Sequence, residues 1–494
     1  MKKLFLFLVA GFFAFAEISC AFQMEPSAST AAQSTEESDE QSGEQQNAPA
    51  QDNGASGVTG DETEDNAIDD EVDQSLLPKD WTFIVYMAAD NNLESSAIAD
   101  FNELENTDFA AHNMNMLVLF DRADGYDATN GNWTDTRLFN VCCDAEKTNA
   151  IVSERISCPA LGLSAGEATE LDMANPATLS NLIAFAGKAY PAEHYGLILW
   201  GHGTGWRNLN SAAGETDENF RAVAIDDYAG TYMTISSLRT GIERGLSQVD
   251  GVNQFDFIGF DTCFGICMET AYELRACSEF LAGTPALVPE SGWNYDALFS
   301  SFVDGEKSVS ALCESALAQY KAQYSYYGYA SFSVVECAKV GGAVQAFDEF
   351  ARSCAEKITD TESRNVYRTI FQSQAESYFA TLYKCDFYAD VFSLASCVKA
   401  ADASLSAPCE KLCSALKNAV SCSWTARSDA SECPLGVFYA VFIVDGVPEV
   451  PHSSAYISGS RVSNQSQFVL DCAGYVPSAS CSGSLLDKLF YTQF

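Results

Sequence analysis

Basic residues and histidines are scarce in this sequence, and their scarcity excludes several classes of protein. The 494-residue chain carries 27 lysines and arginines against 68 aspartates and glutamates, which gives a formal net charge of −41. A nucleic-acid-binding protein needs a basic face to meet phosphates, and an acidic chain is repelled by an anionic membrane surface. We therefore expect no nucleic-acid partner. The four histidines leave few candidates for any chemistry that needs an imidazole.

Long apolar runs are missing after the first twenty residues, so we expect no transmembrane helix. Lys2 and Lys3 precede an apolar run over residues 4–16, which is typical of an export signal and too short for a permanent span. Two processing schemes stay open: cleavage after Ala16, or a lipobox in which Cys20 is acylated. We expect an exported protein that is either secreted or held at the cell envelope, and an N-terminal lipid on Cys20 is the one membrane attachment that the sequence leaves open.

Apolar residues and bases are both rare in residues 21–77. No lysine or arginine occurs between Lys3 and Lys79, and serine, glutamate, glutamine, aspartate, alanine and glycine dominate. Such a composition cannot bury a core, so it predicts an acidic disordered linker or a propeptide. The alternative is a spacer that has no specific partner.

The chain as a whole is 47% hydrophobic and 12% aromatic, which is enough to build a large core. Apolar runs over residues 81–88, 114–120, 195–200 and 255–260 predict buried strands that alternate with helical patterns. The polar triplet at 90–92 ends the first run and is expected to cap the next helix. Wholly apolar strands that alternate with helices form a mainly parallel sheet covered on both faces, so we predict an α/β sandwich. Functional groups of such sheets gather at the carboxyl ends of the strands.

Two of these strands end in residues suited to nucleophilic catalysis. His202 follows the strand at 195–200 with a glycine on each side, and glycines allow the backbone to approach a ligand closely. Cys263 follows the strand at 255–260 and precedes a predicted helix. An adjacent imidazole and a helix N-terminus both favour a reactive thiolate. The histidine precedes the cysteine by about 60 residues, which excludes the papain arrangement and suits the caspase type.

These motifs resemble the clostripain family of cysteine peptidases, part of the caspase-like clan. The similar segments are residues 81–94, 195–206, 226–227, 255–274 and 292–295, with weaker ones at 386–390 and 436–443. The resemblance covers roughly residues 80–445 and implies a caspase-like α/β/α sandwich. It implies that His202 is the general acid and base and that Cys263 is the nucleophile. The backbone N–H groups of Gly203 and Cys263 would form the oxyanion hole.

The resemblance also implies a preference for basic residues before the cleaved bond. In this family an aspartate two residues before the nucleophile lies at the floor of the S1 pocket, and Asp261 holds that position. A second acid usually precedes the Gly-Trp turn. Here Ser291, or the neighbouring Glu290, takes its place, which leaves the choice between arginine and lysine open. Family members also cut themselves after the catalytic histidine, and Arg221, or else Arg207, is the expected site.

We therefore expect a signal peptide at 1–20, the linker or propeptide at 21–77, a caspase-like catalytic domain at 78–335, and a C-terminal extension of mixed helices and strands packed on the core at 336–494. The expected function is that of an exported cysteine endopeptidase that cleaves protein or peptide substrates after arginine or lysine. No cofactor is expected to be required and no metal ligand is assigned, although the family analogy admits calcium; the chain has no EF-hand loop. A catalytically silent surface lipoprotein that binds other proteins is the alternative, and an enzyme with another specificity is a third reading.

The chain has 18 cysteines, a number that suits an exported protein. Setting aside Cys20 and Cys263 leaves sixteen. No Cys-x-x-Cys pair of the kind found in zinc sites occurs. Disulfides clustered in the C-terminal third are the favoured interpretation, and free, buried thiols are the alternative.

Overall fold

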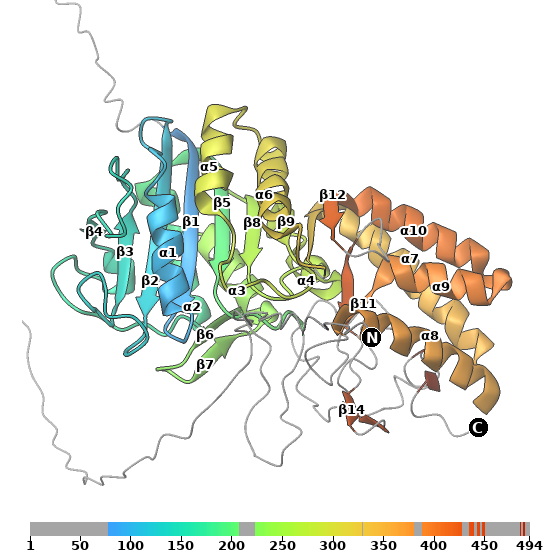
Figure 1. The fold of residues 1–494 in the computed structure, drawn as a ribbon. Coiled ribbons are helices and arrows are strands. Elements are labelled where there is room, and N and C mark those ends of the chain that lie inside the picture. Colours follow the sequence, from blue (N-terminus) through green and yellow to red (C-terminus); the bar gives the residue numbers. More distant parts are fainter. Residues whose placement is uncertain are drawn as a thin grey trace, which may run out of the picture. The chain divides into compact units, whose positions relative to one another are not determined.

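A nine-stranded sheet forms the centre of the protein (Figure 1). The computed structural model describes residues 78–206, 223–328, 330–379, 388–426, 434–438, 442–444, 447–449, 485 and 488–489. The strand order is β12-β10-β9-β8-β5-β1-β2-β3-β4. In chain order these strands are β1 (Lys79–Ala89), β2 (Met114–Arg122), β3 (Thr136–Asn140), β4 (Arg155–Ile156), β5 (Ala192–Trp200), β8 (Phe255–Asp261), β9 (Ser278–Gly283), β10 (Ser331–Glu336) and β12 (Val420–Thr425).

The five central strands β9, β8, β5, β1 and β2 run parallel to one another. All nine residues of β2 are buried, as the prediction of a sheet covered on both faces requires. The outer strands differ, because β3 and β4 on one side and β10 and β12 on the other pair antiparallel. Four of these five strands were predicted from the apolar runs, whereas β9 was not, and the antiparallel edges extend the parallel core on both sides.

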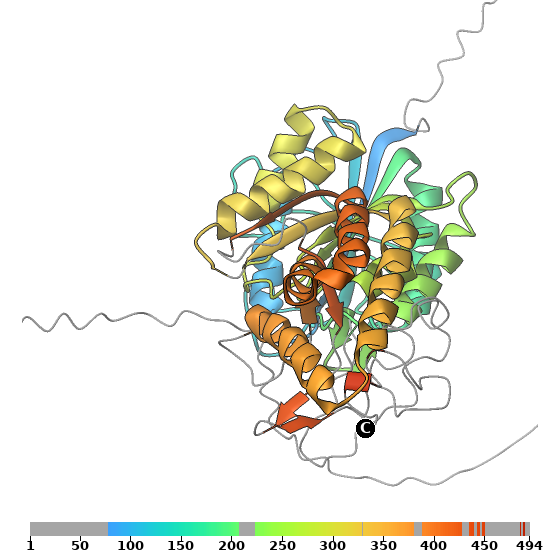
Figure 2. The ribbon, with the colours of Figure 1, turned by 90° about the vertical axis from the view of Figure 1, so that its right-hand side faces the viewer.

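Side chains of β1 alternate between two hydrophobic cores, one on each face of the sheet. Tyr86 belongs to one core, and its neighbours Val85 and Met87 belong to the other. The helices form two layers over these cores, and Figure 2 shows α5 and α6 on one side of the sheet and α3 on the other. One layer comprises α1 (Glu94–Leu104), α5 (Tyr295–Asp304) and α6 (Val309–Tyr324), and the other α2 (Pro176–Ala189), α3 (Ile235–Leu246) and α4 (Met268–Leu274). The predicted α/β/α sandwich is confirmed.

The residues after β10 are mainly helical. Their helices are α7 (Cys337–Lys357), α8 (Thr361–Phe379), α9 (Val391–Ala401) and α10 (Ser406–Ala419). Helix α7 contacts α4 and β9, and α10 lies along α7 before the chain enters β12. Short strand pairs complete the described elements: β6 (Val223–Asp226) with β7 (Thr231–Met233), β11 (Tyr388–Asp390) with β13 (Gly436–Phe438), and β14 (Phe442–Val444) with β15 (Val447–Glu449). None of the described helices combines the length and apolar character needed to cross a bilayer.

The polar triplet at 90–92 does not cap α1 as predicted. Leu93 is the N-cap residue, and no side chain caps this helix end. The Asn91 carboxamide oxygen accepts a hydrogen bond from the Leu93 N–H at 3.0 Å, while its amide group donates to the carbonyls of Ala88 and Ile225 at 3.1 Å each. The triplet therefore ties the end of β1 to β6 instead of terminating the helix.

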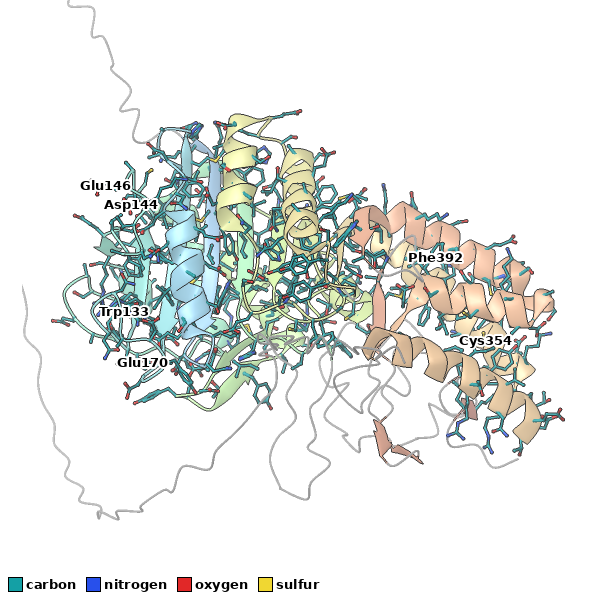
Figure 3. The ribbon with its side chains drawn as sticks, in the orientation of Figure 1. Trp133, Asp144, Glu146, Glu170, Cys354 and Phe392 are labelled. Atoms are coloured by element: carbon teal, nitrogen blue, oxygen red, sulfur yellow. The ribbon has the colours of Figure 1, made fainter. Side chains whose placement is uncertain are left out.

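A buried ion pair fixes α1 against β2. The Arg122 Nε atom lies 2.6 Å from Oε1 of Glu94, and both side chains are fully buried. The guanidinium also donates to the Asp127 carbonyl and lies 4.6 Å above the ring of Trp133, which Figure 3 labels. Because neither side chain is exposed to water, each charge is stabilised by the other, and removing one would leave the other buried and unpaired.

Several of the cysteines are buried as free thiols. These are Cys158, Cys267, Cys313, Cys337, Cys354 and Cys409. The alternative interpretation of buried, unpaired thiols therefore holds for these six. The predictions for residues 1–77, including Cys20, lie outside the described residues. The predicted boundary between residues 335 and 336 also stays a prediction.

Candidate active site

The pairing of β5 with β8 brings the two predicted catalytic residues to the same end of the sheet. Trp200 and Asp261, the last residues of the two strands, lie opposite each other, and the Gly201 N–H donates to the Asp261 carbonyl at 3.3 Å. His202 and Cys263 each follow two residues later. Because the strands are parallel neighbours, both side chains belong to the carboxyl edge of the sheet, where such folds place their functional groups.

Gly203 shows how closely the two loops approach. A Cβ atom at this position would lie 2.6 Å from the Cys263 carbonyl oxygen and 2.7 Å from Cβ of Thr262. Only glycine leaves room for the histidine loop to lie on the backbone of the cysteine turn. Gly203 also forms a β-bridge with Val223, the first described residue after the gap at 207–222. The structure thus brings together His202, Gly203 and Cys263.

The other described histidines lie elsewhere. His194 pairs in register with Trp81 near the amino end of the sheet, stacks on that indole, and contacts the Asp256 carboxylate through Nδ1 at 2.9 Å. His112 lies in the turn before β2. His202 is therefore the histidine at the carboxyl edge among those that the structure describes.

Asn92 orients the imidazole of His202. The Nε2 atom of His202 lies 2.7 Å from Oδ1 of Asn92, and the histidine side chain is largely buried. Asn92 belongs to the same polar triplet that ties β1 to β6. The nearby Asp227 also interacts with this imidazole, although burial outweighs that attraction and raises the pKa of Asp227. The sequence indicated no role for Asn92 in the site, because its contact spans 110 positions.

The thiol of Cys263 receives a backbone hydrogen bond. Its Sγ atom accepts from the Val288 N–H at 3.3 Å and lies 3.7 Å from the Val288 carbonyl oxygen. The next residue, Phe264, has φ +57°, a left-handed conformation that a bulky residue adopts only under constraint. Its N–H donates to the Ala286 carbonyl at 2.7 Å. The chain therefore turns sharply after the cysteine and runs beside the segment that leads to Val288.

A pocket opens next to the thiol. Its lining residues are Leu93, Trp200, Gly201, Asp261, Cys263, Val288, Pro289, Glu290 and Gly292. Among these described residues two are acidic and none is basic. The negative charge of the lining therefore suits a cationic side chain, and Cys263, the proposed nucleophile, is itself part of the lining.

Asp261 is the buried carboxylate of this pocket. Its Oδ2 atom accepts hydrogen bonds from the Trp293 N–H at 2.9 Å and from the Tyr295 hydroxyl at 3.0 Å. Its Oδ1 atom is buried and has no hydrogen-bond partner. Burial raises the pKa of Asp261 to about 7, against the two hydrogen bonds that lower it. An unpaired, desolvated carboxylate oxygen is a strong acceptor for a guanidinium or ammonium group.

A second buried carboxylate, Asp100, lies beside Asp261 and was not predicted. It comes from the apolar face of α1, and its Oδ2 atom accepts the Trp200 indole N–H at 2.6 Å. Burial and the charge of Asp261 raise the pKa of Asp100. A Cβ atom on Gly292 would lie 2.8 Å from Oδ2 of each aspartate, so both carboxylate groups lie against this glycine. The sequence signal that could have revealed Asp100 is an acidic residue at a position on the apolar face of an amphipathic helix.

The remaining predicted specificity residues take different positions. Glu290 lines the pocket. Ser291 is exposed and lies outside the lining, and its hydroxyl is 3.5 Å from the Tyr324 hydroxyl. Arg207 and Arg221, the predicted self-processing sites, lie outside the described residues.

Comparisons with known proteins match this chain to the clostripain family and to C11 cysteine proteases. The sequence model of the clostripain family matches residues 85–456. Clostripain from Hathewaya histolytica is 27% identical over 240 residues, which is 45% of this chain and 42% of that relative, so the match spans less than half of the relative's length. A secreted C11 cysteine protease from Bacteroides thetaiotaomicron with an irreversible peptide inhibitor is 19% identical, with a TM-score of 0.46 over 77% of this chain and 94% of that one. An inactive zymogen C11 protease from Parabacteroides distasonis is 21% identical, with a TM-score of 0.48 and the same coverage of 77% and 94%.

Proposed function

Because this chain belongs to the clostripain family of cysteine peptidases, we propose that it is an endopeptidase with Cys263 as its nucleophile and His202 as its general acid and base. The Cys263 sulfur attacks the substrate carbonyl, and the imidazole of His202 carries the proton to the departing amine. Water then hydrolyses the thioester with the same imidazole as base. The Val288 N–H that donates to the sulfur supports this role, because such a bond favours the thiolate over the thiol.

The backbone N–H groups of Gly203 and Cys263 stabilise the oxyanion of the tetrahedral intermediate. This assignment is supported by the close approach of Gly203 to the backbone of residues 262–263, which leaves no space for a side chain. Donors held in a fixed arrangement lower the barrier without reorganising during the reaction.

The substrate is proposed to carry arginine or lysine before the cleaved bond. One observation carries this proposal: the buried Oδ1 atom of Asp261 has no partner in a pocket that opens at Cys263. A cationic side chain supplies the missing donor. Asp100 adds a second negative charge behind Gly292, and Glu290 adds one in the lining.

The test compares two cysteine variants on arginine- and lysine-ended amide substrates. Cys263→Ala abolishes hydrolysis. Cys267→Ala is the matched control, because Cys267 is likewise buried, lies four residues later, and has its Sγ atom 3.2 Å from the Thr270 hydroxyl. The Cys267→Ala variant is expected to keep its hydrolytic activity. If wild-type protein cleaves neither substrate and Cys263 resists alkylation, the protein is instead a silent surface lipoprotein that binds other proteins. A substrate library identifies any other specificity.

Self-processing and export complete the proposal. Cleavage after Arg221, or after Arg207, is supported by their place in the sequence between Trp206 and Val223, because Val223 forms a β-bridge with Gly203 next to His202. N-terminal sequencing then finds a second chain in wild-type protein and a single chain in Cys263→Ala; an active but uncut wild type contradicts the cleavage. Mass spectrometry of the mature N-terminus distinguishes cleavage after Ala16 from acylation of Cys20, and a chain that keeps its first twenty residues contradicts both.

A further inference from the structure

An aromatic side chain is exposed on the turn between β6 and β7, outside the pocket described above. The Tyr228 side chain is 79% exposed. It is the most exposed of the large hydrophobic side chains at the surface of the described part of the chain, which are Tyr126, Val152, Tyr228, Tyr326 and Val366. Burial of apolar surface is what stabilises a fold, so this ring adds little to folding and can pack against a bound molecule.

The backbone of this turn is fixed by two buried carboxylates. Oδ2 of Asp90 accepts the Tyr228 N–H at 2.8 Å, and Oδ1 of Asp226 accepts the Ala229 N–H at 2.7 Å. The Asp90 carbonyl also accepts the Asp227 N–H at 3.0 Å. Because both carboxylates are buried, water competes little for these bonds. The ring of Tyr228 therefore projects from a rigid support, as a residue that selects a ligand requires.

The same turn lies beside the proposed general acid and base. Gly203, which follows His202, forms a β-bridge with Val223, the first residue of β6. Asp227 of the turn interacts with the imidazole of His202. The triplet at 90–92, which holds the turn, also supplies the carboxamide that orients this imidazole. Figure 1 shows β6 and β7 at the end of the sheet where β1 and β5 end.

The pocket and the turn lie toward opposite faces of the sheet. Leu93 and Trp200 of the pocket lining belong to the hydrophobic core beneath α1, α5 and α6. Val223 and Met233 of the hairpin belong to the core beneath α2, α3 and α4. The carboxyl edge of the sheet, which carries His202, runs between the two. A peptide that enters the pocket from one face therefore meets the hairpin on the other side of this edge.

The proposed reaction sets the direction in which a substrate crosses the edge. His202 gives its proton to the departing amine, and that amine belongs to the first residue after the cleaved bond. The basic residue before the bond occupies the pocket lined by Asp261 and Cys263, so the chain after the bond leaves past His202. An extended peptide advances about 3.3 Å per residue, which brings its first two side chains after the bond to the elements around His202. The turn at Tyr228 is such an element.

We propose that Tyr228 contacts the first or second residue after the cleaved bond and favours an apolar side chain there. The inference rests on the proposed peptidase function and extends it to the part of the substrate that the pocket does not contact. An aromatic face packs best on apolar and aromatic partners. Acidic side chains are disfavoured, because residues 223–233 include two aspartates and no lysine or arginine.

Internally quenched peptides with arginine before the cleaved bond test the inference. One pair carries leucine or glycine directly after the bond, and a second pair varies the next position. In wild type the leucine peptide of at least one pair has the higher kcat/KM, by about three- to tenfold, as expected for an apolar side chain that packs on one ring. Tyr228→Ala brings this ratio close to one, whereas Tyr228→Phe keeps it. Tyr326→Ala, which removes a ring 76% exposed just after α6, also keeps it.

An arginine aminocoumarin amide separates contact with the substrate from support of His202. This amide has no amino acid after the cleaved bond, so Tyr228→Ala cleaves it at the wild-type rate. Slower cleavage of the amide by Tyr228→Ala shows that the turn supports the imidazole instead, and it overturns the inference.

The peptide ratios give the other contrary outcomes. Equal rates for leucine and glycine in wild type overturn the inference, as does a ratio that Tyr228→Ala leaves unchanged or that Tyr326→Ala lowers equally. Each of these results leaves cleavage of the amide intact, so only the role of Tyr228 fails. A wild type that cleaves neither the amide nor the peptides contradicts the proposed peptidase function itself, and the inference falls with it.

Discussion

Replacing Asp261 by asparagine should weaken the enzyme and strengthen the fold at the same time. Oδ2 of Asp261 accepts both hydrogen bonds and Oδ1 accepts none. An asparagine whose oxygen takes the place of Oδ2 therefore keeps both bonds, and its amide group takes the place of the unpaired oxygen. The substitution removes the charge with little change in packing.

The activity loss follows from the lost ion pair with a basic substrate. Removing one partner of a buried charge pair costs about 2–5 kcal/mol, which corresponds to roughly 30- to 4,000-fold in kcat/KM. The assay compares an arginine substrate with its uncharged citrulline analogue, because the ratio cancels any effect on the catalytic dyad. We expect a high ratio in wild type and a much lower ratio in Asp261→Asn, in which Asp100 and Glu290 are the acids that remain near the pocket.

The same ratio should depend on pH. Since the pKa of Asp261 is about 7 in the free protein, only about a tenth of the molecules carry the carboxylate one pH unit lower. The ratio for wild type then falls about tenfold for each unit below pH 7 and levels off above it. A ratio that stays high in the asparagine variant, or that does not change between pH 5 and 8, would refute the role of Asp261.

Stability changes in the opposite direction. The pKa of Asp261 is raised from 3.8 to about 7, so the folded state holds a proton that the unfolded state releases between these values. Wild-type stability therefore falls as the pH rises from about 4 to 7, by an upper limit of ~4 kcal/mol. Asp261→Asn lacks this penalty, and its unfolding free energy, measured by urea denaturation at pH 8, should exceed that of wild type. A less stable variant would contradict the hydrogen-bond assignment.

Two further substitutions test the contact between the two catalytic loops and the buried ion pair between α1 and β2. Gly203→Ala places a methyl group 2.6 Å from the Cys263 carbonyl oxygen, so the two loops must separate and kcat/KM should fall about 100-fold or more. Gly166→Ala is the control: its methyl group meets open space, and the variant should keep full activity. Glu94→Gln leaves the buried Arg122 charge unpaired and should cost about 3–5 kcal/mol of unfolding free energy in chemical denaturation; a loss below about 1 kcal/mol would show that the pair is not essential.

The sequence predicted those parts of the protein whose signal is local. Continuous apolar runs predicted the parallel strands β1, β2, β5 and β8, and the glycine-flanked His202 and the turn at Cys263 predicted the candidate site. The resemblance to the clostripain family is confirmed. Asp100 and Asn92 escaped prediction because their roles exist only after folding. Asp100 meets Gly292 across 192 positions, and Asn92 meets His202 across 110.

Strands β10 and β12 escaped prediction for a related reason. Strand β10 begins Ser-Phe-Ser, and β12 reads Val-Ser-Cys-Ser-Trp-Thr, so neither is a continuous apolar run. Both take their strand form from pairing with distant residues. The polar triplet at 90–92 has a typical capping composition, but the contacts of Asn91 with the end of β1 and with β6 prevailed over the local preference.

The position of β12 sets the order in which the protein can be completed. Phe332 of β10 pairs with Trp424 of β12, 92 positions later, and β10 in turn pairs with β9 beside the strand that leads to Cys263. The ribosome releases both proposed catalytic residues well before Trp424. Until then β10 has an open edge, which can pair with other chains, and such distant pairing forms slowly. The newly made chain thus passes through an interval in which its catalytic residues are present and its sheet is unfinished.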